Sequence, residues 1–429
     1  MKIILKQVTL LNPEQKLNEK NDLLIVDGII KKIGNVKEED FKESKIFEFE
    51  NKICSPGFFD MHVHFREPGR EDEETIESGS NAAAAGGFTG VACMPNTNPD
   101  IDSAEIVRFI KEKAKNHLVD VYPVGAATLA RKGEALSPMY ELFEAGAVAF
   151  SDDGVAIKNS GVLRNALEYS RHFGTPIIEH CEDESFSDGA MNEGLTSTML
   201  GLQGIPNVAE DLIVMRDIIM SEFIGGKIHI AHISTKGAVE MVRQAKKRGA
   251  KVTAETTPHH FTLTDDSVKT YDTNYKMSPP LRSSEDVAAI IEGLSDGTID
   301  CIASDHAPHA IEEKEMEFIF APNGILGLET QLGLVLSELF HKKHLTLPQV
   351  VEKLAVNPRK ILNIRIPDIK EGDAANLTIF DPNLIWTVDV SKFKSKAKNS
   401  PFDKRLMNGK AVAVINNSCM FFEDKFFSI

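Results

Sequence analysis

Short apolar runs alternate with longer amphipathic stretches along most of the chain after residue 53. The runs have the length of buried strands, and the stretches between them repeat apolar residues at helical spacing. Strands that alternate with helices in this way predict βαβ units and a parallel sheet. The predicted strands are 58–65, 89–94, 120–124, 147–151, 176–180, 227–233, 251–255 and 299–304. The predicted helices are 75–85, 103–117, 138–145, 161–173, 208–223, 235–248 and 284–294.

The number of predicted strands favours one α/β architecture over another. Eight strands with intervening helices predict a closed (β/α)8 barrel, a TIM barrel. A doubly wound open sheet is the alternative. No Gly-x-Gly-x-x-Gly follows the first strand, which weighs against a dinucleotide-binding sheet of that kind.

Both ends of the chain have a different sequence pattern, with short apolar runs separated by turn signals and few stretches of helical periodicity. Runs at 3–5, 8–10, 23–26 and 29–33 predict strands at the N-terminal end, and runs at 377–380, 386–388 and 411–415 predict strands at the C-terminal end. Asp27-Gly28, Asn408-Gly409 and Asn416-Asn417 are predicted turns. We therefore expect one small β-rich domain built from residues 1–50 and 368–429, with the barrel formed by residues 51–367.

Composition narrows the class of protein. The chain has 429 residues, 42% of them hydrophobic, which suits a globular barrel plus a second unit. The formal net charge of -16 argues against non-specific binding to nucleic acid or to anionic membranes. Five scattered cysteines without a Cys-x-x-Cys pair fit a reducing compartment. No signal peptide or long apolar span is evident, so a cytoplasmic protein is expected.

Polar side chains follow six of the predicted barrel strands. His62 and His64 lie two residues apart on the first strand, so both face one side and can bind one metal ion. A lone His-x-His is weak evidence, because such pairs are more often surface or core histidines. In a barrel, however, the carboxyl ends of all strands meet at one rim. The rim also receives Asn96, Asp152, Asp153, His180, Glu182, His232, Asp305 and His309.

This combination of imidazoles and carboxylates predicts a metal centre. Four histidines and two aspartates exceed the ligands that one tetrahedral ion needs. They fit two divalent ions about 3.5–4 Å apart, which activate water and polarise a carbonyl. An aspartate beside that water can carry a proton to a leaving nitrogen. The chemistry indicated is hydrolysis of an amide bond.

The motifs then resemble a known family. Segments 60–69, 94–97, 151–154, 180–183, 232–235, 278–282, 304–309 and 324–330 are similar to those of class I bacterial dihydroorotases in the amidohydrolase superfamily. The resemblance implies one or two zinc ions bound by His62, His64, Asp153, His180, His232 and Asp305. Asp153 would bridge the ions, where hydantoinases and allantoinases use a carboxylated lysine. Asp305 would also be the catalytic acid and base.

The resemblance also implies a substrate site. Arg66 would hold a carboxylate with a bidentate pair, with Asn96 and His309 beside it. Ser278, Asn323 and Gly324 would line the ring, although Ser278 replaces the family's usual asparagine and Asn323 its usual phenylalanine. Two nearby features are read more simply. His229 is expected to be structural, and the acidic residues 71–74 are expected to be a solvated helix start.

Three functions remain open at this point. The first is dihydroorotase, which interconverts N-carbamoyl-L-aspartate and (S)-dihydroorotate in pyrimidine synthesis. The second is another cyclic amidohydrolase, a hydantoinase or allantoinase, which a bridging lysine would have favoured. The third is a non-catalytic homologue that serves as an assembly partner, which loss of a metal ligand would have favoured. The family also implies a homo-oligomer, expected to be a dimer, and an association with aspartate carbamoyltransferase.

Overall fold

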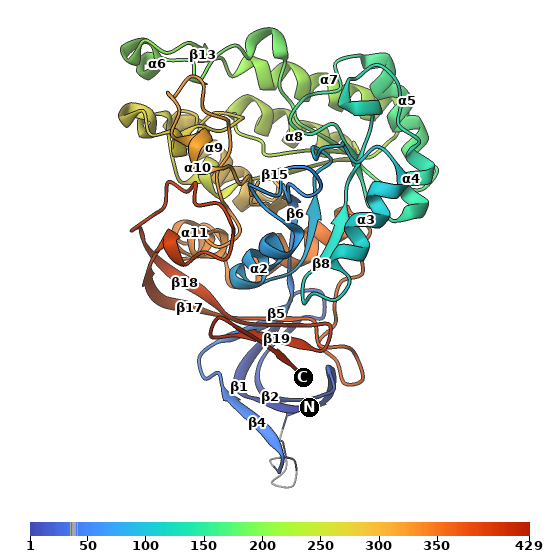
Figure 1. Cartoon of the computed structure of the whole chain (residues 1–429), viewed down its shortest axis with the longest axis vertical. Helices are drawn as coiled ribbons and strands as arrows, with labels where there is room; N and C mark the ends of the chain where they lie inside the picture. Colours follow the sequence, from blue (N-terminus) through green and yellow to red (C-terminus); the bar gives the residue numbers. More distant parts are fainter. Residues whose placement is uncertain (35, 37–39, 41) are drawn as a thin grey trace.

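The computed structural model describes residues 1–34, 36, 40 and 42–429, and its central element is a closed barrel (Figure 1). Hydrogen-bonded strands run in the order β6–β7–β8 and β9–β10–β11–β14–β15–β16. Only Val124 separates β8 from β9, so these two segments form one barrel strand. The barrel closes through a parallel bridge between Val63 and His306, where the His64 N–H donates to the His306 carbonyl at 2.9 Å. The predicted eight-stranded barrel is confirmed, and an open sheet is excluded.

The barrel strands match the predicted positions, and five of them, β6, β10, β11, β14 and β16, are shorter than predicted. They are β6 (Phe58–Val63), β7 (Phe88–Cys93), β8 (Asp120–Pro123), β9 (Gly125–Ala126), β10 (Phe150–Ser151), β11 (Ile177–Glu179), β14 (Ile228–Ile230), β15 (Val252–Thr256) and β16 (Cys301–Ile302). The apolar runs extend beyond the paired residues because an apolar pattern records burial, whereas a strand assignment records hydrogen bonding.

All seven predicted helices are present around the barrel. They are α2 (Ile76–Gly86), α3 (Ala104–Ala114), α4 (Met139–Ala145), α5 (Ser160–Ser170), α7 (Val208–Ile224), α8 (Lys236–Arg248) and α9 (Ser284–Asp296). Local signals set their ends. Thr75 and Ser283 form capping boxes at the starts of α2 and α9, and Gly87 ends α2 in the left-handed conformation at φ 102°.

Several short elements were not predicted, because they are too short to show a periodic pattern. They are β12 (Met191–Asn192), α6 (Leu195–Leu200), β13 (Gly204–Ile205), α10 (Ile311–Lys314), α11 (Gln331–Leu334), α12 (Leu347–Val351) and α13 (Asn357–Ile361). Wide π-type turns at Val335–Phe340 and Glu352–Val356 continue α11 and α12. Across the described residues, no helix has both the length and the apolar character to cross a membrane.

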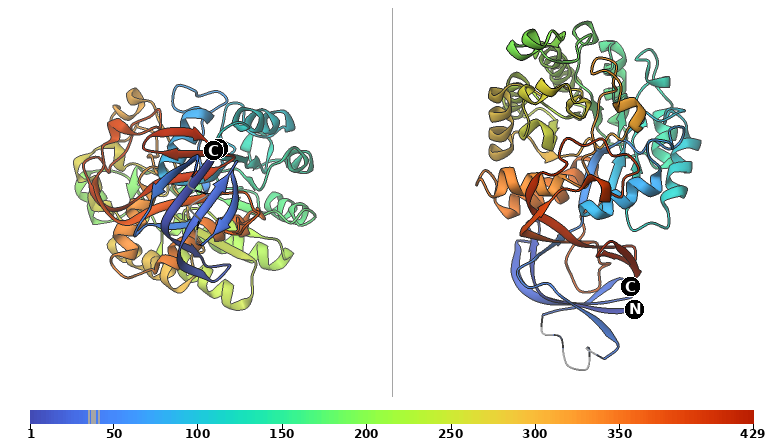
Figure 2. Two further views of the ribbon diagram at one scale, coloured as in Figure 1. Left: turned by 90° about the horizontal axis from the view of Figure 1, so that it is seen from below. Right: turned by 60° about the vertical axis from the view of Figure 1, so that its left-hand side comes forward.

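Both chain ends contribute to one sheet below the barrel, as the sequence predicted (Figures 1 and 2). Its strands are β1 (Lys2–Asn12), β2 (Leu17–Val26), β3 (Ile29–Ile33), β4 (Ser44–Glu48), β5 (Ile53–Pro56), β17 (Leu377–Thr387), β18 (Leu406–Asn416), β19 (Cys419–Phe422) and β20 (Lys425–Ser428). β5 pairs with β1 on one side and with β17 on the other, so it joins the N-terminal and C-terminal halves.

Two of the three predicted turns are present. Asp27-Gly28 connects β2 to β3, and both residues have positive φ, as a tight hairpin requires. The turn after β18 uses Asn417 and Ser418, one residue later than predicted. The prediction for Asn408-Gly409 is wrong, because both residues lie inside β18. They sit where the register shifts against β17, and this irregularity accommodates Gly409 at φ 89°.

The connection between β17 and β18 leaves the terminal sheet and reaches the barrel. Val388 and Phe402 from this connection pack with Met277, Leu281 and Ile325 of the barrel loops. Asn399 donates its Nδ2 to the carbonyls of Ala307 and Gly324, at 3.0 and 3.1 Å. A C-terminal segment therefore supports the loops that carry candidate site residues, a contact that sequence spacing does not reveal.

Candidate metal centre and active site

His62 lies near the end of strand β6 and His64 directly after it, and each ring is oriented by an oxygen acceptor. Nδ1 of His62 lies 2.7 Å from Oε1 of Glu255, and Nδ1 of His64 lies 2.8 Å from Oδ1 of Asn96. An imidazole that donates from Nδ1 presents the lone pair of Nε2 on its other side. Both rings therefore offer Nε2 to the interior of the rim.

Asp153 lies at the centre of the predicted ligands. Its Oδ1 is 3.3 Å from Nε2 of His62, 3.7 Å from Nε2 of His232 and 3.8 Å from Nδ1 of His180. Its Oδ2 is 3.6 Å from Nε2 of His64. Two groups of three ligand atoms, each compact enough for one ion, share Asp153. This position suits a carboxylate that bridges two ions.

Asp305 completes the cluster from the segment after β16. Its Oδ1 lies 3.0 Å from Nε2 of His64 and 3.7 Å from Nε2 of His62. Asp305 and His232 both have positive φ, 48° and 29°, where side chains other than glycine are strained. The fold therefore holds these two side chains in place against a local backbone preference.

The burial, the unpaired polar atoms and the charges of the cluster favour a bound cation. All six predicted ligands are buried. Nε2 of His62 and Oδ1 of Asp153 have no hydrogen-bond partner, which buried polar atoms rarely lack. Although burial alone would raise the pKa of Asp153, the neighbouring histidines hold it well below its usual value. Burial opposes a charge on His62, yet Asp153 and Glu255 raise its pKa well above normal. The residues present therefore fit a metal centre.

A column of polar side chains continues from His62 into the barrel interior. Oε2 of Glu255 lies 3.3 Å from Nε2 of His229, and Nδ1 of His229 lies 2.8 Å from Oγ1 of Thr253. Glu255 was missed at the sequence level, although it falls at the end of a predicted strand. His229 supports Glu255 and lies away from the predicted ligands, in line with a structural role.

The predicted carboxylate clamp, Arg66, is held by an acidic residue that the sequence analysis misjudged. Nε of Arg66 lies 3.2 Å from Oε2 of Glu73 and donates to the Pro308 carbonyl at 3.1 Å. Oε1 of Glu73 lies 3.0 Å from Nδ1 of His309. The expectation that residues 71–74 are all solvated is wrong, because Glu73 and Glu74 are only 3% and 0% exposed. A contiguous acidic run does not reveal which members turn inward toward cations.

The remaining predicted substrate residues surround the same rim. Oγ of Ser278 donates to Oε2 of Glu182 at 2.9 Å. Nε2 of His309 lies 2.7 Å from the backbone oxygen of Asn323. Gly324 has φ 126°, and a Cβ there would lie 2.6 Å from Cβ of Ala307, so this position requires glycine.

Two buried lysines fix the loop that carries Asn323 and Gly324. Nζ of Lys314 donates to the carbonyls of Pro322 and Gly324 at 2.9 and 3.1 Å. Nζ of Lys276 donates to the carbonyls of Ile319 and Ala321 at 2.9 and 2.7 Å. Burial lowers the pKa of Lys314 to about 7. The loop is therefore anchored through its backbone.

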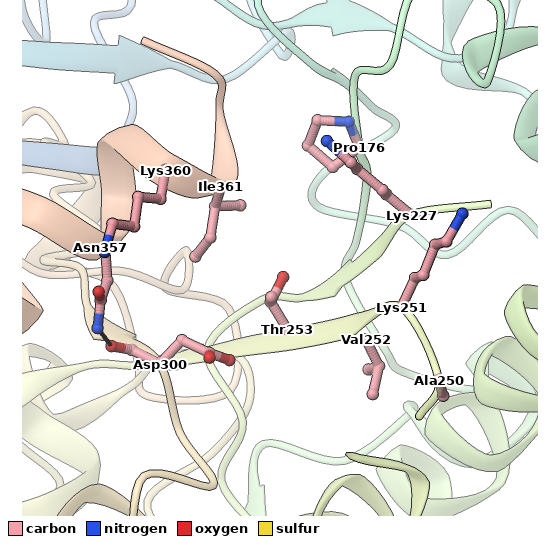
Figure 3. Close-up of a pocket in the computed structure, with 10 residues that line it drawn as sticks. All are labelled: Pro176, Lys227, Ala250, Lys251, Val252, Thr253, Asp300, Asn357, Lys360 and Ile361. Atoms are coloured by element: carbon pink, nitrogen blue, oxygen red, sulfur yellow. Dashed lines mark hydrogen bonds between the residues drawn. The ribbon is translucent and has the colours of Figure 1, made fainter. Parts of the chain in front are cut away.

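A cavity of about 410 Å³ lies at the opposite end of the barrel strands (Figure 3). Its walls include Lys227, Lys251 and Asp300, which precede strands β14, β15 and β16. Residues at this end of a barrel usually serve stability. Asp300 is paired there with Lys246 at 2.6 Å, and its backbone oxygen accepts from Asn357. The metal-capable cluster therefore lies at the other end, at the carboxyl ends of the strands.

Known proteins resemble this chain over nearly its whole length. The family model described as "Dihydro-orotase-like" matches residues 51–238. Proteins named dihydroorotase from Pelotomaculum thermopropionicum and Acetivibrio thermocellus are each 48% identical, with 99% of both chains covered. The dihydroorotase of Geobacter metallireducens is 51% identical over 405 residues, 94% of this chain and 95% of that protein.

Solved structures show the same architecture. The L-hydantoinase (dihydropyrimidinase) of Arthrobacter aurescens has a TM-score of 0.86 at 26% identity, with 98% of this chain and 96% of that one covered. The dihydropyrimidinase of Brevibacillus agri has a TM-score of 0.83 at 20% identity, covering 99% of this chain and 96% of that one, which supports the fold alone.

The barrel, the terminal β sheet and the buried histidine–aspartate cluster together define a metal-binding hydrolase of the amidohydrolase class. Within that class, the relatives that share about half of their residues with this chain over nearly its whole length are named dihydroorotase. The chain belongs to the dihydroorotase family.

Proposed function

We propose that this chain catalyses the reversible cyclisation of N-carbamoyl-L-aspartate to (S)-dihydroorotate, with release of water. The observation that carries the proposal is Asp153, a carboxylate placed among four buried histidines and shared by two three-ligand groups. The family assignment supports the substrate, because the relatives are named dihydroorotase. Hydantoinase or allantoinase activity is the alternative, favoured by the likeness to L-hydantoinase.

The proposed cofactor is Zn2+, as one or two ions held by His62, His64, Asp153, His180, His232 and Asp305. Imidazole nitrogen and carboxylate oxygen are the ligands that zinc prefers in catalytic sites. When bound, such ions lower the pKa of water toward ~7 and polarise the amide carbonyl. Glu255 and Asn96 hold the rings of His62 and His64 so that Nε2 faces the ligand cluster.

Asp305 is the proposed proton carrier. Despite its burial, the hydrogen bond from His64 and the nearby histidines keep the pKa of Asp305 below its usual value, so it enters the reaction as a carboxylate. In the hydrolytic direction it accepts a proton from the attacking water and passes it to the ring nitrogen. That nitrogen cannot leave as an anion, so the transfer permits cleavage.

Arg66 is the proposed partner of the substrate carboxylate. Nε of Arg66 donates to the Pro308 carbonyl and lies 3.2 Å from Glu73, and its guanidinium is proposed to form the bidentate pair with the substrate. Asn96, His309, Ser278, Asn323 and Gly324 are proposed to complete the substrate site. Because Ser278 donates its hydroxyl hydrogen to Glu182, its oxygen is proposed to serve the substrate as an acceptor.

One assay separates the candidate activities. Purified protein is given dihydroorotate, hydantoin or allantoin, and the metal content of the same sample is measured. Dihydroorotate turnover that exceeds the other two and falls on chelation is the expected result. Preferred turnover of hydantoin or allantoin assigns the alternative, and a metal-loaded protein without any turnover assigns a non-catalytic partner role.

The organisation of the chain and its assembly are part of the proposal. We propose residues 51–367 as the catalytic barrel domain and residues 1–50 with 368–429 as the β domain, which supplies no catalytic residue. Strand β5 (Ile53–Pro56) lies within the first range but pairs with β1 and β17 in the terminal sheet. We further propose a homodimer, with association with aspartate carbamoyltransferase as a second assembly. Size measurements of the protein alone and mixed with that enzyme test both assemblies.

A further inference from the structure

The loop after the last barrel strand carries His309 and Gly324, two of the proposed substrate residues. We call residues 307–326 the rim loop. Its outer part is poorly packed, because Ile311 and Phe320 are 60% and 64% exposed. The two substrate residues, by contrast, are buried at the base of the loop. The contacts at this base therefore decide where the substrate residues lie.

Asn399, in the connection between β17 and β18, joins the two ends of the rim loop. Its Nδ2 donates to the carbonyl of Ala307 at one end and to that of Gly324 at the other, at 3.0 and 3.1 Å. Its Oδ1 accepts from the His309 N–H at 3.2 Å, and its backbone oxygen accepts from the Leu326 N–H at 2.9 Å. The side chain is 5% exposed, so its amide nitrogen and oxygen are both committed to the loop.

A buried amide that is bonded in this way fixes the groups around it. A buried polar network with its hydrogen bonds satisfied specifies one local arrangement, because a partner left unpaired costs free energy. Asn399 therefore ties the spacing between His309 and Gly324 to its own position. Nε2 of His309 adds a second tie across the loop, 2.7 Å from the backbone oxygen of Asn323. Separating the two ends of the rim loop requires these hydrogen bonds to break.

Two acidic side chains hold the segment on which this asparagine lies. We call residues 393–400 the strap. Glu329 accepts from the Lys394 N–H at 2.8 Å, and the fully buried Glu74 accepts from the Lys396 N–H at 3.0 Å. Carboxylate acceptors form stronger hydrogen bonds to backbone N–H groups than neutral acceptors do. Because both acidic residues belong to the barrel, the strap is fixed relative to the barrel rim.

We propose that Asn399 is a positioning residue of the substrate site. From the strap it holds His309 and Gly324 at the separation that the substrate requires, and it acts through these two residues. The role assigned to Asn399 rests on the proposed function, because that function places His309 and Gly324 beside the substrate. It also gives the connection between β17 and β18 a part in substrate binding, although this connection supplies no catalytic residue.

The expected effect falls on substrate binding more than on the chemical step. Loss of the tie displaces His309 and Gly324, whereas the proposed metal ligands and the proton carrier Asp305 lie outside the rim loop. A misplacement of about 1 Å can cost ~100-fold in rate. Contacts made equally to substrate and transition state change KM and leave kcat unchanged. Removing the tie should therefore raise KM for dihydroorotate ~10–100-fold, while kcat falls less than about threefold.

Asn416 provides a matched control in the same C-terminal segment. Both asparagines are 5% exposed, and Nδ2 of Asn416 also donates to a barrel carbonyl, that of Leu118 at 2.9 Å, and to the carboxylate of Asp120 at 3.0 Å. Leu118 precedes strand β8, at the end of the barrel opposite the rim. Asn399→Ala and Asn416→Ala therefore remove comparable buried donors and should lower the melting temperature similarly. Only Asn399→Ala should raise KM.

Hydrogen exchange tests the tie without any turnover. Steady-state kinetics, metal content and amide exchange by mass spectrometry are measured on wild type and both variants. In Asn399→Ala, peptides that cover residues 307–326 should exchange at least ~10-fold faster than in wild type, because the base of the loop opens more often. The same peptides in Asn416→Ala should exchange at the wild-type rate. Metal content should be equal in all three proteins.

Asn399→Asp separates the two donors from the acceptor. Aspartate keeps the oxygen that accepts from the His309 N–H, but it replaces Nδ2 with an oxygen that faces the carbonyls of Ala307 and Gly324. It should therefore raise KM at least as much as Asn399→Ala. Because it is nearly isosteric with asparagine, it gives the same readouts if Asn399→Ala does not fold.

Three results would overturn the positioning role. They are a KM within about twofold of wild type in a folded Asn399 variant, unchanged exchange of the rim loop in that variant, and an equal rise of KM in Asn416→Ala. The last result would make both asparagines part of the packing only. Faster exchange of the rim loop in Asn399→Ala, combined with a wild-type protein that does not turn over dihydroorotate, would support the tie and reject the proposed function instead.

Discussion

The rim of the barrel and the terminal sheet differ in whether their buried polar atoms have hydrogen-bond partners. At the rim, Nε2 of His62 and Oδ1 of Asp153 are buried without a hydrogen-bond partner, and His232 and Asp305 have strained backbones. In the described parts of residues 1–56 and 368–429, no buried side-chain nitrogen or oxygen lacks a partner. The interior of the sheet consists of residues such as Leu5, Ile25 and Ile379, none of them exposed.

This difference indicates that the rim serves metal binding and catalysis, whereas the terminal sheet contributes to the stability of the fold. Unpaired buried polar atoms cost free energy, and at the rim a bound cation would satisfy Nε2 of His62 and Oδ1 of Asp153. Apolar burial needs no ligand and stabilises the fold directly. Variants at the rim should therefore change catalysis and metal binding, and variants in the sheet should change the free energy of unfolding.

The largest effect is expected for Asp305→Asn at the rim. Asparagine keeps the size and one oxygen but cannot carry the proton, so kcat should fall by ~10²–10⁴-fold. Metal content and thermal unfolding should change little, and both are measured on the same preparation. A variant with its metals intact and more than about a tenth of wild-type kcat would remove Asp305 from the proton-transfer role.

The matching change in the sheet is Ile25→Ala. Ile25 is fully buried in the hydrophobic core formed by the residues of the terminal sheet. Removing its side chain should lower the free energy of unfolding by about 2–5 kcal/mol, measured by denaturant titration. Below the unfolding transition, kcat and KM should stay at wild-type values. A loss of kcat in folded protein would contradict the proposed separation of the two regions.

Glu255→Gln tests whether Glu255, which contacts His62 from the barrel interior, supports metal binding at the rim. Glutamine can still accept from Nδ1 of His62 but no longer provides a negative charge. Loss of such support for a metal ligand typically weakens metal affinity 10–100-fold. Competition with a chelator measures this affinity, and Glu255→Asp should recover part of it. Unchanged affinity in Glu255→Gln would make this carboxylate part of the packing only.

Arg66→Lys tests the substrate side of the rim. Lysine keeps the charge but loses the planar fork, so KM for dihydroorotate should rise about tenfold or more while metal content stays constant. Arg164→Lys is the control, because Arg164 is an exposed residue of helix α5 that pairs with Glu168 at 3.1 Å. Equal effects of the two substitutions on KM would count against the clamp.

The smallest effect concerns Lys314, a buried cation outside the metal cluster. Its pKa is about 7 in the folded protein, against 10.5 for the ordinary side chain. Between these values the unfolded chain binds the proton and the folded chain does not, so this group makes stability rise as pH rises from about 7 to 10.5. Lys314→Met should flatten that rise relative to wild type in denaturant titrations across this range. Identical slopes for the two proteins would refute the assignment.

Sequence pattern alone determined the barrel, its helices and the shared terminal sheet. Periodicity records which side chains are buried. Because the carboxyl ends of barrel strands meet at one rim, the sequence alone predicted that six side chains lie together there: His62, His64, Asp153, His180, His232 and Asp305. Their roles as ligands and that of Asp305 in catalysis remain predictions. Capping residues such as Thr75 and turn residues such as Asp27-Gly28 act within a few positions, so their effects could also be read locally.

Tertiary structure decided the contacts between segments far apart in the chain. Glu73 turns inward because Arg66 and His309 lie beside it, and Asn399 supports the loop at Gly324 from 75 residues away in sequence. The apolar run of α7 predicts burial, but only its place on the outside of the barrel reveals an uncovered face. A sequence pattern indicates which residues are buried. Which residues they contact depends on how distant segments come together in the folded chain.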